Sequence, residues 1–311
     1  MFLLYSGKVI FRVASDGGFA TLRRGNAALA LGLRSSSRFA KGEPVQHPEP
    51  LVDIHCHLLP GTDDGSKSWT ESLEMARIAV AEGIDSVVAT PHQLGSFSHN
   101  DGQSIRTRTS HLCRFLADHG VPLRVLPGAD VRIEANLVAG IERGEVLTIA
   151  DKRRHVLLEL PHELYFPLEP VLDQLRTAGL VGILSHPERN QALLKQPDLL
   201  GPLVDDGCLM QITAGSLTGS FGPASQQLAE RMCALDLAHF VATDAHGSKW
   251  RRPLMASAFK RVAALCDTET AVRLCRQNPA LVIEGDDVAA RPRKTGQLRR
   301  WGAWFGWRTA G

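Results

Sequence analysis

The sequence contains few cysteines, and none of them lies in a pair with metal-binding or redox spacing. Its six cysteines are scattered over 311 residues without a C-x-x-C pair, which argues against a thiolate metal site or a thioredoxin-like motif. The sequence also has no recognisable secretory signal. We therefore expect reduced thiols, mostly buried as small apolar side chains, in a cytoplasmic protein. The six are Cys56, Cys113, Cys208, Cys233, Cys266 and Cys275.

Long apolar runs and several common catalytic motifs are also missing. The opening stretch MFLLYSGKVIFRVA is too short for a membrane span, and Lys8 and Arg12 interrupt it. No G-x-x-x-x-G-K-[ST] loop and no G-x-S-x-G elbow occurs, so P-loop nucleotide hydrolysis and serine-triad chemistry fit poorly. The net charge of +2 gives no sign of a nucleic-acid partner, and we expect none.

Acidic residues are scarce at both ends of the chain. Residues 1–42 carry seven basic residues and one acid, Asp16, and we interpret residues 1–50 as a disordered extension or the product of a misassigned start codon. After Asp287 there are six basic residues, no acid and three of the five tryptophans. This pattern is typical of peripheral contact with a membrane surface or an acidic partner; a disordered solubilising tail is the alternative. The predicted divisions are 1–50, 51–285 and 286–311.

Short apolar runs alternate with helical patterns from Leu51 onward. The runs are continuous, as expected of parallel strands buried on both faces. One helix is predicted to begin with a capping box formed by Ser68 and Glu71. Seven such units predict an α/β fold, a distorted (β/α)7 TIM-like barrel, with a doubly wound open sheet as the alternative. The predicted strands are 51–56, 86–90, 124–130, 156–160, 181–185, 209–213 and 239–243.

Side chains that bind metals recur where the predicted strands end. In a parallel barrel the C-terminal ends of all strands open on one face, where active sites are built. Burying so many carboxylates and imidazoles without a cation would be costly, so the pattern predicts a metal site at that face. Histidine and carboxylate donors without thiolate suit Mn, Zn or Fe. The residues are Asp53, His55, His57, Asp64, His92, Asp130, Glu159, His186, Asp244 and His246.

The motifs that carry these residues resemble those of the PHP (polymerase and histidinol phosphatase) superfamily. They are most similar to those of its bacterial capsule- and exopolysaccharide-regulating tyrosine-protein phosphatases. The resemblance covers roughly residues 51–283 and implies a PHP barrel with its metal site at the C-terminal face of the strands. It rests on DIHCHLLPGTDDGS, ATPHQ, PGADVRI, LLELP, LSHPERN, QITAGSLTGSFG and VATDAHG, in that order.

The resemblance implies three metal ions, most often manganese in this family, with iron or zinc as alternatives. Each ion would have its own ligand set, with one carboxylate shared. The sets are His55, His57, Asp130 and Asp244 for the first ion, Asp130, Glu159 and His186 for the second, and Asp64, His92 and His246 for the third.

Two arginines match those that contact the phosphate in this family. They are Arg189 in HPER and Arg252 in KWRRP, with Arg251 as the alternative in that pair. Guanidinium groups suit this role because their forked N–H donors fit phosphate oxygens. The catalytic residues implied by the resemblance are thus Asp64, His92, Arg189 and Arg252.

One position departs from the family pattern. The family usually has glutamate as the bridging ligand where this chain has Asp130. The shorter side chain reaches less far by about one carbon–carbon bond, or ~1.5 Å. We therefore expect the ions to lie closer to the strand, the backbone to shift, or one ion to bind more weakly. Glu134 is expected to lie too far along the chain to replace it.

The activity that the resemblance implies is hydrolysis of phosphotyrosine by metal-activated water, without a phosphoenzyme. The implied partner is the phosphotyrosine-rich tail of a membrane-bound bacterial tyrosine kinase that controls capsular or exopolysaccharide biosynthesis. A cysteine-based mechanism is excluded, because no cysteine is followed by arginine six positions later. Histidinol phosphatase, another small-molecule phosphoesterase and a non-catalytic metal-binding module remain alternatives. A metal-dependent amidohydrolase is a further rival, although no predicted strand ends in the lysine that many of them use.

Overall fold

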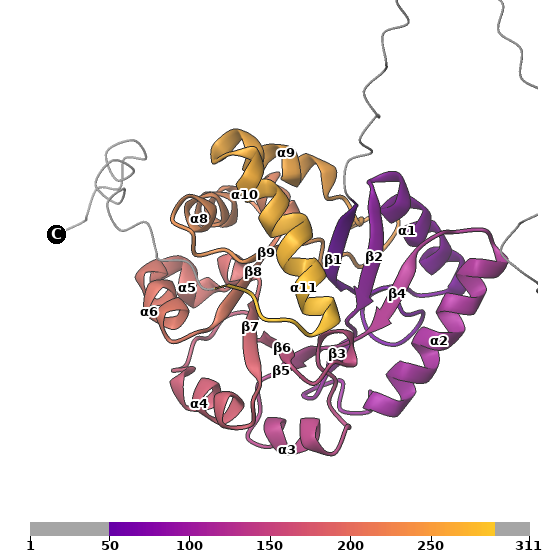
Figure 1. Ribbon diagram of the computed structural model, residues 1–311, viewed down its shortest axis with the longest axis horizontal. Coiled ribbons are helices and arrows are strands. Elements are labelled where there is room, and N and C mark those ends of the chain that lie inside the picture. Colours follow the sequence, from indigo (N-terminus) through magenta and orange to yellow (C-terminus); the bar gives the residue numbers. More distant parts are fainter. Residues whose placement is uncertain (1–49, 290–311) are drawn as a thin grey trace, which may run out of the picture. The chain divides into compact units, whose positions relative to one another are not determined.

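The computed structural model describes residues 50–289, in which strands and helices alternate along the chain. In Figure 1 the strands lie toward the centre and most helices lie around them. The strands are β1 (Leu51–Cys56), β2 (Ile84–Ala89), β3 (His92–Gln93), β4 (Arg124–Pro127), β5 (Asp130–Arg132), β6 (His155–Glu159), β7 (Val181–Ser185), β8 (Leu209–Thr213) and β9 (Phe240–Ala242). The α-helices are α1 (Trp69–Ala81), α2 (Gly102–Asp118), α3 (Leu137–Glu142), α4 (Glu169–Thr177), α5 (Gln191–Lys195), α6 (Leu200–Asp205), α7 (Ala214–Leu217), α8 (Pro223–Ala234), α9 (Ala256–Leu265), α10 (Thr268–Val272) and α11 (Asn278–Glu284).

Neighbouring strands pair in parallel throughout the described part of the chain. One sheet has the order β1-β2-β4, and the other has the order β3-β5-β6-β7-β8-β9. The α/β class and the parallel pairing predicted from the sequence are therefore confirmed, and closure of the strands into a barrel stays a prediction.

The two sheets adjoin on one side, where β2 and β4 lead into β3 and β5, and backbone hydrogen bonds connect them on the other. Asp130 N donates to Pro91 O at 3.2 Å, next to the point where β2 and β4 give way to β3 and β5. On the other side, Asp244 N donates to His55 O at 2.7 Å and His57 N donates to Ala245 O at 2.9 Å. Because parallel strands present their C-terminal ends on one side, these bonds bring the ends of β1, β3, β5 and β9 together.

The predicted strand 124–130 is divided into β4 and β5 at Gly128. A Cβ atom at Gly128 would lie 2.6 Å from Cγ1 of Val88 on the neighbouring strand, closer than real Cβ atoms come. Only glycine lets the chain pass this close to the Val88 side chain. After Ala129, β5 begins at Asp130.

Strand side chains are apolar on both faces, as the continuous runs predict. One face packs against the surrounding helices in a large cluster. The opposite face of strands in both sheets packs against α11 and forms a second cluster. In Figure 1 this helix, in yellow, crosses in front of the strands. The second cluster includes Val52, Ile54, Val88, Leu157, Ile183, Leu209, Phe240, Val282 and Ile283.

Helix α1 begins where the sequence predicts, with Ser68 as its N-cap. The Ser68 hydroxyl accepts a hydrogen bond from Glu71 N at 3.2 Å, whereas the Glu71 carboxylate accepts from Lys67 N at 2.9 Å rather than from Ser68 N. The cap thus fixes the end of the histidine-bearing loop that follows β1. Among residues 50–289, no helix combines the length and the apolarity needed to cross a bilayer.

Candidate metal centre

The structure brings all nine predicted metal ligands together, although His92 and Asp130 stand at the first positions of β3 and β5 rather than at the ends of strands. Four overlapping groups have ligand atoms that lie within 4.8 Å of one another. They come from segments up to 191 positions apart, from His55 to His246, because the strand ends meet there. The groups are His57, Asp64, His92 and His246; His55, His57 and Asp130; His55, His186 and Asp244; and His92, Asp130 and Glu159.

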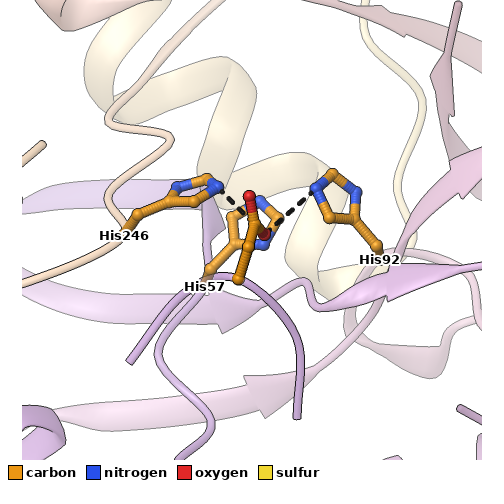
Figure 2. A group of neighbouring side chains, drawn as sticks. His57, His92 and His246 are labelled. Atoms are coloured by element: carbon orange, nitrogen blue, oxygen red, sulfur yellow. Dashed lines mark ion pairs between the residues drawn. The ribbon is translucent and has the colours of Figure 1, made fainter. Parts of the chain in front are cut away.

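The first group surrounds a carboxylate from the loop after β1. The Asp64 Oδ1 atom lies 3.4 Å from His92 Nε2 and 3.5 Å from His246 Nε2. Figure 2 shows His57, His92 and His246 around this position, with ion pairs from His92 and His246. The neighbouring imidazoles of His246 and His92 hold the pKa of Asp64 well below its usual range. Asp64 is therefore ionised and available as a ligand, and its side chain is 54% exposed.

Asp130 lies between two of the groups and is completely buried. Its Oδ2 atom lies 3.6 Å from His55 Nε2 and 3.5 Å from His92 Nδ1, so the shorter side chain still reaches both sides. Burial, followed by the nearby Glu159, raises its pKa well above the usual range. By contrast, Glu134 is exposed and accepts a hydrogen bond from Gly95 N, which confirms that it does not replace Asp130.

Neither carboxylate oxygen of Asp130 has a hydrogen-bond partner. The same is true of Asp244 Oδ1, His92 Nδ1 and His246 Nε2, which all face this cluster. Buried polar atoms without partners are strongly unfavourable unless a ligand or ion satisfies them. A set of imidazole and carboxylate donors in this state fits divalent cations.

The grouping in the structure differs in part from the ligand sets that the resemblance implies. The implied set of Asp64, His92 and His246 is present, with His57 added. His186, implied to share an ion with Asp130 and Glu159, groups instead with His55 and Asp244, although its Nε2 lies 3.9 Å from Asp130 Oδ2. Which residues share each ion stays a prediction.

Two neighbouring polar residues, not among the predicted site residues, orient His55 on β1 and His57 directly after it. Gln211 Oε1 on β8 lies 2.8 Å from His55 Nδ1, and Asp63 Oδ2 lies 2.7 Å from His57 Nδ1. Each contact leaves the Nε2 atom of the ring facing the cluster, as metal-binding histidines require. The acidic pair of DDGS was a signal for Asp63, whereas Gln211 lies 156 positions from His55 and had none.

The charge state of the histidines varies sharply across the centre. Burial lowers the pKa of His55 to about 3, so this ring is neutral and able to bind a cation. Burial also lowers the pKa of His57, but the charges of Asp63 and Asp244 outweigh it and raise the value to about 9. At His92 the neighbouring carboxylates of Asp64 and Glu159 likewise outweigh burial and raise the pKa to about 11. Metal binding must therefore displace protons from His57 and His92.

Asp53 does not join the ligand groups, although its position on β1 placed it among the predicted ligand types. Its carboxylate accepts hydrogen bonds from Thr243 N at 2.9 Å and from His55 N at 3.2 Å. Burial raises its pKa to about 6. Asp53 thus connects β1 to Thr243, directly after β9, and holds the backbone of the predicted ligand His55.

The two arginine predictions have different outcomes. Arg189 contacts Asp244 Oδ2, and Arg251 contacts the same oxygen. Arg252 is exposed, and its backbone carbonyl accepts a hydrogen bond from Leu254 N. The structure therefore brings Arg189 and Arg251 to the metal centre, and it favours the alternative in the Arg251–Arg252 pair.

Three residues of the centre have a left-handed backbone that non-glycine residues rarely adopt. They are His186, Asp244 and Arg251, with φ angles of 33°, 48° and 46°. Such conformations cost of order 1–3 kcal/mol each and tend to cluster at functional sites. Here they direct two predicted ligands and one arginine toward a common point.

Known proteins resemble this chain over nearly all of its described part. The family model for capsular polysaccharide synthesis, CpsB/CapC, matches residues 51–284. Tyrosine-protein phosphatase YwqE of Bacillus subtilis is 37% identical over 203 residues, which cover 65% of this chain and 79% of the relative. The putative tyrosine-protein phosphatase CapC of Staphylococcus aureus is 37% identical over 206 residues, covering 66% and 80%.

A solved structure shares the fold. The match is to crystal structures of YwqE from Bacillus subtilis and CpsB from Streptococcus pneumoniae, described as unique metal-dependent tyrosine phosphatases. The TM-score is 0.75 and the sequence identity is 33%, over 78% of this chain and 98% of the matched chain.

Proposed function

Because the chain belongs to the capsular polysaccharide synthesis family CpsB/CapC, we propose that it is a metal-dependent tyrosine-protein phosphatase. Relatives at 37% identity carry that name. One observation in the structure carries the proposal. The Asp244 carboxylate turns Oδ1 toward His55 at 3.3 Å and Oδ2 toward Arg189 and Arg251. The Asp244 carboxylate thus contacts both the proposed cation site and the two proposed phosphate-binding arginines.

We propose that the centre holds three manganese ions. The fit rests on the donor set, which is imidazole and carboxylate without thiolate, and on the buried atoms of Asp130 and Asp244 that have no partner. His55, His57, Asp64, His92, Asp130, Glu159, His186, Asp244 and His246 would hold the ions.

The chemistry that bound metal ions supply is a hydroxide nucleophile near neutral pH, since coordination lowers the pKa of water. The chain's own residues bind and orient the substrate. The guanidinium groups of Arg189 and Arg251 would each donate hydrogen bonds to phosphate oxygens and offset their charge. Gln211 and Asp63 keep the β1 histidines in place during the reaction. The phenol of tyrosine ionises at about pH 10, so the tyrosine oxygen leaves with little help from an acid.

We also propose that the two sheets act as one distorted seven-stranded barrel. The hydrogen bonds of Asp130 N with Pro91 O and of Asp244 N with His55 O support closure. So does the apolar cluster that β1 and β2 share with β6 to β9. A barrel would explain why all nine ligands gather at one end of the strands.

The proposed physiological substrate is the phosphotyrosine-rich tail of a membrane-bound bacterial tyrosine kinase, through which the enzyme would regulate polysaccharide synthesis. Support comes from the family, which is described by capsular polysaccharide synthesis. The basic, tryptophan-rich segment that would contact a membrane, 286–311, lies almost entirely outside the described residues.

The test compares a phosphotyrosine peptide with histidinol phosphate as substrates, after chelation and again after manganese is restored. Wild type is assayed beside His186→Ala, because His186 groups with His55 and Asp244. We expect manganese-dependent release of phosphate from the peptide and loss of that activity in the variant.

Hydrolysis of histidinol phosphate alone would replace the proposed substrate with a small molecule. If the manganese-loaded protein released phosphate from neither substrate, the phosphatase proposal would be wrong, and a non-catalytic metal-binding module would take its place.

A further inference from the structure

The aromatic ring of Phe221 lies against both arginines of the centre. The guanidinium carbon of Arg189 is 4.1 Å from the ring centroid, and that of Arg251 is 5.8 Å away. Both distances fall within the roughly 6 Å over which a guanidinium is attracted by the negative face of an aromatic ring. Phe221 belongs to the QITAGSLTGSFG motif, of which the proposed function uses only Gln211.

Two cations that share one carboxylate repel each other unless other groups compensate. Arg189 and Arg251 both contact Oδ2 of Asp244, so an additional attraction from the Phe221 face helps to keep them side by side. The ring accepts no N–H hydrogen bond from the guanidinium edge, so the donors that Asp244 does not occupy stay available to a phosphate. The ring can therefore hold an arginine without competing with phosphate for its donors.

The chain around Phe221 fixes the position of the ring. A Cβ atom at Gly215 would lie 2.8 Å from Cε2 of Phe221, so the ring packs directly on the glycine backbone. Ser220 N also donates a hydrogen bond to Gly215 O at 2.8 Å. Helix α7, which contains Gly215, thereby fixes the position of the Phe221 ring against the two arginines.

The same helix is attached to the turn that carries Arg189. The buried Glu188 carboxylate accepts hydrogen bonds from Thr213 N at 2.8 Å and from Ser216 Oγ at 2.7 Å. Glu188 immediately precedes Arg189 in the chain. The segments that carry Arg189 and Phe221 are thus joined by the hydrogen bonds of Glu188 with Thr213 and Ser216.

We propose that Phe221 is a positioning residue that holds Arg189 and Arg251 with their N–H edges turned toward the phosphate of the substrate. This inference rests on the proposed function, since it assigns the arginines to phosphate binding. Loss of the ring weakens phosphate binding and leaves the metal ligands in place.

The experiment measures phosphate binding by calorimetry, with inorganic phosphate added to the manganese-loaded protein, together with steady-state hydrolysis of a phosphotyrosine peptide. The variants are Phe221→Leu, which removes the aromatic face, and Phe221→Tyr, which keeps it. Phe259→Leu is the matched control, because Phe259 lies under Arg276 at 4.8 Å and outside the metal centre.

For Phe221→Leu we expect phosphate affinity and kcat/KM to fall by about 5- to 30-fold, the range of a partly desolvated cation–π contact. The change should lie mainly in KM, with manganese content unchanged. Phe221→Tyr should stay within about twofold of wild type, as should Phe259→Leu. Gly215→Ala, which pushes the ring out of place, should act in the same direction as Phe221→Leu.

A double-mutant cycle separates positioning from a general structural role. In an Arg189→Met, Arg251→Met background, Phe221→Leu should change phosphate affinity by less than about twofold, because the residues through which it acts are gone. An equal loss in both backgrounds would overturn the proposal, and so would unchanged phosphate affinity in Phe221→Leu. If wild type bound phosphate but did not hydrolyse the peptide, the proposed function would fail, while the calorimetry would still decide the role of Phe221.

Discussion

The carboxylate of Asp63 lies 2.7 Å from Nδ1 of His57, and the same Oδ2 atom accepts a hydrogen bond from His92 N at 3.0 Å. Burial raises the pKa of Asp63, but the charge of His57 outweighs it and lowers the pKa to about 2. The carboxylate is therefore ionised and accepts the Nδ1 proton. One residue thus sets the orientation of His57, directly after β1, and the backbone position of His92 on β3.

We predict that Asp63→Asn weakens manganese binding by about 10- to 100-fold, the usual effect of removing a residue that orients a metal-binding histidine. The fold should be retained with some loss of stability, because the amide oxygen can replace only one of the two carboxylate oxygens, which accept from Gly65 N and from His92 N. Titration of the metal-free protein with manganese, followed by calorimetry, measures the change. Asp118→Asn, at the exposed end of α2, is the control. Equal affinities for Asp63→Asn and wild type would show that Asp63 does not orient the ligand.

Asp130→Asn should have opposite effects on stability and activity. The buried carboxylate has no hydrogen-bond partner in the absence of metal, so replacing it with a neutral amide should stabilise the metal-free protein by about 1–3 kcal/mol. Manganese-dependent hydrolysis should be lost, because Asp130 reaches two of the ligand groups. Urea unfolding in the presence of a chelator measures the first effect, and peptide hydrolysis measures the second. A metal-free variant less stable than wild type would contradict the prediction.

Substitutions of Arg251 and Arg252 should have different effects on kcat/KM. We expect Arg251→Gln to lower kcat/KM for the phosphotyrosine peptide by about 10- to 100-fold, the range for loss of a charge-assisted hydrogen bond. Arg252→Gln should stay within about twofold of wild type, because the side chain is exposed. The two variants change neighbouring residues in the same way, so each is the control for the other. The reverse order would place Arg252 at the phosphate.

We predict that His155 makes the stability of the protein depend on pH, whether or not metal is bound. Burial lowers the pKa of this histidine to about 4, below the value of about 6.5 in unfolded chains. The unfolded state therefore binds the proton first as the pH falls. The stability contributed by the neutral ring is complete above about pH 6.5 and declines toward pH 4, with a slope of at most about 1.4 kcal/mol per pH unit.

His155→Leu should flatten this part of the profile. Neither ring nitrogen of His155 has a hydrogen-bond partner, so an apolar side chain should be tolerated in its place. Urea unfolding of the chelated protein at several pH values between 4.5 and 7.5 provides the comparison, with the exposed His111→Leu on α2 as control. Parallel profiles for wild type and His155→Leu would disprove the role of His155.

The sequence by itself determined the strands and the set of ligands. Continuous apolar runs form parallel strands because both faces must be buried, and β1 and β7 appear within the predicted bounds. His55 and His57 share a direction because side chains alternate along a strand. Their partners lie at the ends of other strands, and a parallel arrangement brings all these ends to one side. Local pattern and chain direction therefore pointed to these nine residues together with Asp53, and the resemblance to the PHP superfamily selected the nine that gather there.

Only the tertiary structure decided how these residues are shared and oriented. His186 and Asp244 both have a left-handed backbone and belong to one ligand group. Histidine and aspartate adopt this conformation more often than most residues, but only a small fraction of them do, so the sequence does not predict it at a given position. The same conformation at Arg251 directs that arginine, rather than Arg252, toward Asp244. Gln211 reaches His55 only because β8 packs nearby, 156 positions along the chain. Such contacts depend on distances of a few tenths of an ångström, which packing sets and sequence spacing does not.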